Sequence, residues 1–254
     1  MEQGHIDYLK NIGIDISHSG HPFAEEFITV TKTRNSSLIR CFEHLLLMLI
    51  LDIETIKKYN LDDYNHYIKR LRATNSSFWG QRFEIFWYSA LISKFEGRVT
   101  DLRRGEEGEE ADFVFKYNGE QISIETTSVV YELTSSMTNP ISKMKRTIGE
   151  KEKKKYANKN CCLIIDYSNL SFYRKIINNF TLTISELIEQ LNSKFGIILF
   201  QYGFHSDDKS NPKYLTQVFD WTSDETNSVM RDFLHENFSQ TDTGGINKIY
   251  FRVS

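Results

Sequence analysis

Two strand-like runs separated by Asn118-Gly119 carry the clearest hydrophobic pattern in the chain. The runs are 111–117 and 120–128. Apolar residues stand at every second position of the first run and at Ile122 and Ile124 of the second. Asn-Gly between such runs predicts a hairpin with a two-residue type I′ turn, because that turn needs positive φ at both central residues. A loop of that length predicts four facing pairs: Tyr117 with Glu120, Phe115 with Ile122, Phe113 with Ile124, and Asp112 with Glu125.

The alternation sorts the hairpin side chains onto two faces. One face is apolar and is interpreted as a core surface: Ala111, Phe113, Phe115, Ile122 and Ile124. The other carries Asp112 opposite Glu125, with Thr127 two positions further on. Like charges directly opposite destabilise paired strands, so the two acids favour a bound cation, and oxygen ligands favour a hard divalent metal. The alternative is that both acids lie on a solvated sheet face.

Apolar residues at helical spacing predict an N-terminal helical region over residues 1–77. One helix begins at Ser36 or Ser37 and runs through Ile50, and a second covers about 62–71. Residues 1–34 show only a weak pattern, and their three histidines are interpreted as surface residues. Residues 78–95 predict a further helix ended by Gly97, with Glu84 beside its apolar stripe.

A basic helix is predicted after the hairpin, over 141–158. Ile141, Met144 and Ile148 form its apolar stripe, and the stripe continues to Lys151, which places that lysine near the buried edge. The other cations around it are Lys143, Lys145, Arg146, Lys153, Lys154, Lys155 and Lys159. Such a helix is either a solvated face or a patch that neutralises backbone phosphates and releases counterions.

The remaining pattern completes an α/β order with a mixed sheet. A strand over Arg98–Thr100 and a charged loop over 101–110 precede the hairpin. Apolar runs predict buried strands at 161–167 and 196–201, with a helix over 183–194 between them. A polar loop follows Gly203, then a helix near 224–238 and a strand at 246–253. The expected organisation is a helical region (1–77), a core (78–205) and an extension completing the same domain (206–254).

Composition narrows the classes of function. The 254 residues carry a net charge of −3, so any nucleic-acid binding must come from a local patch. The apolar run 45–51 is too short to span a bilayer, and the N-terminus lacks the order of a secretory signal. Three cysteines make neither a disulfide framework nor a zinc site, which favours a cytoplasmic location and buried thiols at Cys161 and Cys162. Nucleotide-binding glycine loops, a Gly-x-Ser-x-Gly elbow and a His-Glu-x-x-His motif are absent from the sequence.

The order Glu84, Asp112, Glu125-x-Thr127, basic helix, apolar strand resembles the PD-(D/E)XK nuclease superfamily over residues 78–167. The resemblance implies a restriction-endonuclease-like α/β fold: a helix, a three-stranded antiparallel meander, a crossover helix and a further strand. It also implies that Asp112, Glu125 and Glu84 are metal ligands. Thr127 stands where the family has its motif lysine, and a hydroxyl cannot supply positive charge. Some members move that lysine to a neighbouring helix; Lys151 is the preferred replacement here, with Lys145 and Lys155 on roughly the same side.

The resemblance therefore implies a nuclease that uses Mg²⁺ or Mn²⁺ and hydrolyses phosphodiester bonds, in DNA by preference and in RNA as a possibility. Lys151 would offset charge at the scissile phosphate. Thr127 favours a different hypothesis, a nuclease-like fold without catalysis that serves as a nucleic-acid or protein interaction module. A third interpretation is an α/β protein whose acidic pair and basic helix are solvated surface.

Overall fold

The structure is a computed structural model. It describes residues 3–17, 20–32, 36–72, 77–93, 95, 97–129, 140–168, 180–205, 214–237, 239–242 and 247–250. The chain divides into two compact units. The first comprises residues 1–94 and 205–215, and the second comprises residues 95–204 and 216–254. The sequence-based boundary at residue 77 remains a prediction, and the helix that follows it belongs to the first unit.

The described part of the first unit contains five helices: α1 (Gln3–Asn11), α2 (Pro22–Lys32), α3 (Ser36–Tyr59), α4 (Leu61–Leu71) and α5 (Ser77–Ser93). The predicted helices from Ser36 and near residue 62 are α3 and α4. Asn60 explains where α4 begins, because its side chain accepts hydrogen bonds from the backbone of Asp62 and Asp63. The apolar stripe of α3 is buried as its spacing predicts, with Phe42, Leu46 and Leu49 in the core.

Two features of the first 34 residues differ from the prediction. Helices α1 and α2 form there although the apolar pattern is weak, and each buries only a few side chains, such as Leu9 and Phe23. His21 is not a surface residue: it is buried, and its ring packs edge-on against Phe78 with centroids 4.6 Å apart. His18 lies outside the described residues. Tertiary packing overrides the weak local signal in this segment.

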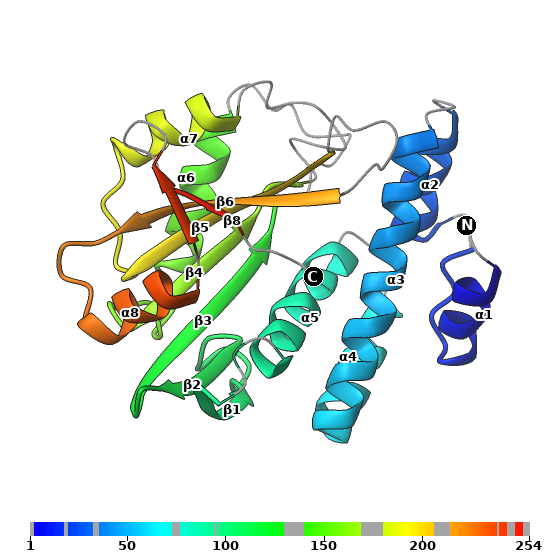
Figure 1. Ribbon diagram of the computed structural model, residues 1–254, viewed down its shortest axis with the longest axis horizontal. Coiled ribbons are helices and arrows are strands. Elements are labelled where there is room, and N and C mark those ends of the chain that lie inside the picture. Colours follow the sequence, from blue (N-terminus) through cyan, green and yellow to red (C-terminus); the bar gives the residue numbers. More distant parts are fainter. Residues whose placement is uncertain are drawn as a thin grey trace. The chain divides into compact units, whose positions relative to one another are not determined.

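A mixed sheet forms the centre of the second unit (Figure 1). Its eight described strands are β1 (Val99–Arg104), β2 (Phe113–Tyr117), β3 (Glu120–Ser128), β4 (Cys161–Asp166), β5 (Ile197–His205), β6 (Tyr214–Thr222), β7 (Ser239–Asp242) and β8 (Asn247–Tyr250). They lie in the order β1-β2-β3-β4-β5-β6-β8-β7. Strands β1 to β3 form an antiparallel meander, and β3, β4 and β5 run parallel. The predicted α/β class with a mixed sheet is confirmed.

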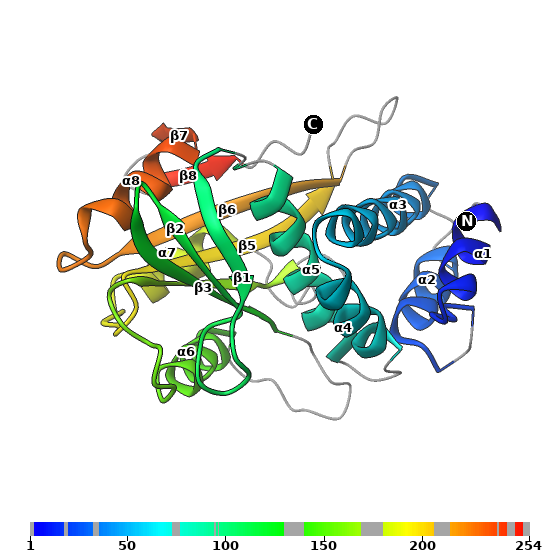
Figure 2. The ribbon, with the colours of Figure 1, turned by 90° about the horizontal axis from the view of Figure 1, so that it is seen from below.

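Three of the four predicted hairpin pairs are confirmed in β2 and β3, which lie side by side in Figure 2. Tyr117 pairs with Glu120, Phe115 with Ile122 and Phe113 with Ile124. Asn118 and Gly119 both have positive φ, 50° and 85°, as a type I′ turn requires. The predicted face is wrong for Ala111. This residue precedes the ladder and packs with the core beneath α6 instead of with Phe113.

In the described part of the second unit, three helices cover the sheet: α6 (Pro140–Lys151), α7 (Phe180–Ile188) and α8 (Ser228–Asn237). Met144 and Ile148 of α6 pack with Ile184 and Leu187 of α7 against the face that carries Leu163 and Ile165. Helix α8 lies against the opposite face of the sheet (Figure 1). There the Phe233 ring contacts the rings of Phe115 and Tyr117. Because both faces are covered, every residue of β4 is buried, including the free thiols of Cys161 and Cys162.

Several predicted boundaries need correction. Asp101–Arg104 belongs to strand β1 and not to the charged loop, and a bulge with Asp101 at φ 53° accommodates it. Helix α6 ends at Lys151 instead of near residue 158, and α7 begins at Phe180 instead of Thr183. Strand β6 occupies part of the predicted polar loop, and β7 was not predicted. In the described part of the chain, no helix is both long and apolar enough to cross a membrane.

Candidate functional site

Asp112 and Glu125 lie together at the end of the β2–β3 ladder, one step beyond the Phe113–Ile124 pair. The backbone N–H of Asp112 donates to Oε2 of Glu125 at 3.2 Å. Glu125 is buried, with 3% of its surface exposed, whereas Asp112 is half-buried. The hairpin register therefore brings the two predicted acids together, and the burial of Glu125 argues against the interpretation that both acids lie on a solvated surface.

Lys151 reaches this pair from the last turn of α6. Its ammonium donates to Oε1 of Glu125, and a quarter of the lysine side chain is exposed. The two other candidate lysines have different partners. Lys145 donates to the Gln190 side chain at 2.7 Å, and Lys155 pairs with Glu109 at 2.7 Å on the surface. Of the three lysines, Lys151 is thus the one in contact with a predicted metal ligand.

The electrostatics of the site follow from burial and from the two neighbouring charges. Burial raises the pKa of the Glu125 carboxyl, and the charge of Asp112 raises this pKa further. Lys151 opposes both effects through its charge and its hydrogen bond. A buried carboxylate that faces a second acid needs positive charge nearby to stay ionised. One ammonium group meets part of that need, and a divalent cation would meet more of it.

Thr127 lies two positions after Glu125 on β3, in register with Ile165 of β4. Alternation along the strand puts it on the same sheet face as Glu125. It is half-buried and carries no charge, so the strand position where the resemblance expects a lysine offers only a hydroxyl group. The positive charge at this site comes from Lys151 of α6 instead.

Glu84 belongs to α5 in the first unit, where it is 5% exposed. The Tyr67 hydroxyl on α4 donates to its Oε1 at 2.9 Å, and Nη1 of Arg70 lies 3.7 Å from its Oε2. Glu84 therefore ties α5 to α4. Its role as a third metal ligand stays a prediction from the sequence.

Two polar residues at the site were not predicted. The backbone N–H and the hydroxyl of Thr126 both donate to Oδ2 of Asp112, at 2.7 Å and 2.6 Å. The Tyr156 hydroxyl, in the turn after α6, makes a side-chain hydrogen bond with Glu125. Burial and the Glu125 charge raise the pKa of Tyr156 well above its usual value, so it stays protonated and acts as a donor. In the sequence, Thr126 is marked only by its place between the two predicted site residues Glu125 and Thr127.

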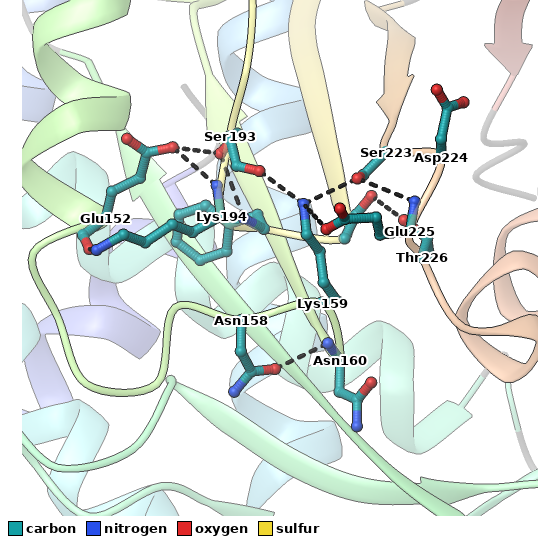
Figure 3. A network of polar contacts seen from close by, with 12 residues as sticks. Glu152, Asn158, Lys159, Asn160, Ser193, Lys194, Ser223, Asp224, Glu225 and Thr226 are labelled. Carbon is teal, nitrogen blue, oxygen red and sulfur yellow. Dashed lines mark hydrogen bonds and ion pairs between the residues drawn. The ribbon is translucent and has the colours of Figure 1, made fainter.

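Lys159, counted among the basic residues of the helix in the sequence, has a structural role (Figure 3). Its ammonium donates to the carbonyl oxygen of Ser193 at 2.9 Å and to the hydroxyl of Ser223 at 2.8 Å, and it lies 3.6 Å from Glu225. These contacts join the segments that lead into β4 and β5 to the turn after β6. The network holds the end of the sheet where β4 and β5 begin.

The two acids at this site, Asp112 and Glu125, suit a metal that needs few protein ligands. Across the described ranges, no group of three or more His, Cys, Asp and Glu side chains is arranged to hold a metal ion. Asp112 and Glu125 remain as two adjacent carboxylates. Mg²⁺ is commonly bound through one or two carboxylates while it keeps several waters, and Mn²⁺ accepts the same oxygen ligands. The pair offers carboxylate oxygens of the kind that both ions bind.

No family model, curated protein or solved structure matches this chain.

Proposed function

We propose that this chain is a divalent-metal-dependent nuclease that hydrolyses phosphodiester bonds, with DNA as the favoured substrate and RNA as the alternative. The observation that carries the proposal is the convergence of three side chains: Asp112 just before β2, Glu125 on β3 and Lys151 at the end of α6. Two acids and one lysine at a partly open position are the groups that metal-assisted phosphoryl chemistry uses.

The order of elements in the second unit supports a place for this chain among the PD-(D/E)XK nucleases. An antiparallel meander of β1, β2 and β3 leads into α6 and then into β4, which runs parallel to β3. The superfamily core implied by the sequence has this same order. The acids stand on β3 and just before β2, where the resemblance expects them.

Each side chain has a role that its position allows. Asp112 and Glu125 would supply carboxylate oxygens for Mg²⁺ or Mn²⁺. The bound ion would polarise the phosphate and lower the pKa of a water molecule. Lys151 favours the ionised form of Glu125 and carries a positive charge that can offset the charge developing on the phosphate. Exposed cations of α6 and the turn after it, such as Arg146 and Lys153, can contact backbone phosphates.

The test is cleavage of plasmid, linear duplex, single-stranded DNA and RNA by the full chain in Mg²⁺, in Mn²⁺ and in chelator. We expect metal-dependent cleavage that is lost in Asp112→Asn and in Glu125→Gln. Glu120→Gln is the matched control, since Glu120 is an exposed acid of the same strand. Thermal unfolding of each variant in chelator shows that it is folded. Cleavage that persists in both acid variants would remove this site from the reaction.

Thr127 supports a second candidate, a nuclease-like fold without catalysis that binds nucleic acid or protein. Position 127 lacks the motif lysine, and Lys151 already neutralises part of the charge on Glu125. The two candidates differ in what Mn²⁺ does to the melting temperature. A ligand-bearing site gains stability by mass action as Mn²⁺ is added, whereas a module without a metal site does not.

A further inference from the structure

Hydrogen bonds hold one of the two carboxylate oxygens of Asp112. Oδ2 accepts both the backbone N–H and the hydroxyl of Thr126, at 2.7 Å and 2.6 Å. Among the described residues, no donor contacts the other oxygen, Oδ1. Thr126 itself is buried, with 6% of its surface exposed.

This arrangement fixes a torsion that is otherwise loose. The carboxylate of an aspartate rotates broadly about χ2, with two nearly equivalent orientations. Two donors that converge on Oδ2 select one orientation and leave Oδ1 with its lone pairs uncommitted. The other hydrogen bonds of Asp112 involve its backbone. Its N–H donates to Oε2 of Glu125, and its carbonyl oxygen accepts from the N–H of Gly105 at 2.9 Å.

We infer that Thr126 is a positioning residue for metal binding: it turns the Asp112 carboxylate so that Oδ1 is the oxygen presented to the ion. The inference rests on the metal site proposed above. Groups that orient a metal ligand commonly change metal affinity about 10- to 100-fold when they are removed. Thr126 makes no contact with the ion in this arrangement and acts through Asp112 alone.

The experiment measures Mn²⁺ binding to the full chain by calorimetry and by the loss of free Mn²⁺ signal in electron paramagnetic resonance. Thr126→Val keeps the side-chain shape and the backbone donor but removes the hydroxyl. Thr126→Ala removes the hydroxyl without adding bulk, and Thr126→Ser restores it. Thr222→Val is the matched control, since the Thr222 hydroxyl donates to another aspartate, Asp220, at 3.2 Å.

The expected result is a Mn²⁺ dissociation constant raised about 10- to 100-fold in Thr126→Val and Thr126→Ala. Thr126→Ser and Thr222→Val should bind as the unsubstituted chain does. Unchanged affinity in the folded Val and Ala variants overturns the role of Thr126 while leaving the metal site intact. A chain that binds no Mn²⁺ at all, before any substitution, overturns the metal site and this inference together.

Discussion

The ammonium of Lys151 donates to Oε1 of Glu125, 26 positions away in the sequence, and so links the end of α6 to the middle of β3. Glu125 is almost fully buried, whereas a quarter of Lys151 is exposed. Lys151 therefore contacts a buried carboxylate while part of its own side chain remains exposed to solvent.

Lys151→Met should lower the cleavage rate about 10²- to 10³-fold, because it removes a positioned charge that stabilises the transition state. The measurement is kcat with saturating Mg²⁺ on the preferred substrate. Lys116→Met is the control: Lys116 lies on β2 of the same sheet and pairs with Asp101 at 2.7 Å on the surface. Equal loss in both variants would mean that general electrostatic attraction, and not the position of Lys151, governs the rate.

Lys159→Met should destabilise the fold without changing metal binding. The substitution breaks two charge-assisted hydrogen bonds to Ser193 and Ser223, which we expect to cost about 2–4 kcal/mol of unfolding free energy. Urea unfolding in chelator measures the loss. Lys194→Met is the matched variant, since the exposed Lys194 makes one bond to the Glu152 carbonyl at 3.2 Å; we expect at most about 1 kcal/mol there. A loss in Lys159→Met no larger than in Lys194→Met would show that the contacts of Lys159 in Figure 3 add little stability.

Two glycines should respond to alanine with opposite signs. At Gly196 a Cβ atom would lie 2.2 Å from the carbonyl oxygen of Lys159, a backbone atom that cannot move aside easily. Gly196→Ala should therefore lower stability by about 2 kcal/mol or more. At Gly149, inside α6, a Cβ would meet no atom within 4 Å. Gly149→Ala should raise stability by roughly 0.5–1 kcal/mol through helix propensity. Urea midpoints that shift in the same direction would contradict this.

The hairpin and its acids could be predicted because their signals are local. Asn118-Gly119 fixes the loop length, the loop length fixes the register, and the register puts Asp112 beside Glu125. Lys151 followed from the stripe of Met144 and Ile148, which is buried as expected. The contact of Thr126 with Asp112 could not be predicted, because it depends on a bend before the ladder and not on a repeat.

The elements that could not be predicted are those stabilised by contacts between segments far apart in the sequence. Strand β6 lies between β5 and β8, and β7 pairs with β8. Pairing with neighbouring strands can stabilise such strands without a strong hydrophobic pattern of their own. The bulge at Asp101 extends β1 through a charged stretch that composition alone interprets as loop. Helices α1 and α2 depend on the packing of a few residues, such as Phe23 against Phe42 with ring centroids 5.5 Å apart.

Acid should weaken the loop before the site through Glu110. Arg103 donates to both Glu110 oxygens, at 2.5 Å and 2.6 Å, and these bonds, with a backbone bond from Glu106, lower the pKa of Glu110 from 4.5 to about 2. A lowered pKa adds stability above the unfolded-state value and loses it as pH falls from about 5 to 2. Glu110 is 29% exposed, so we expect at most about 1 kcal/mol. The Glu110→Gln variant should match the unsubstituted chain at pH 2 and fall below it above pH 5. A Glu110 pKa above 4 by NMR titration would contradict this.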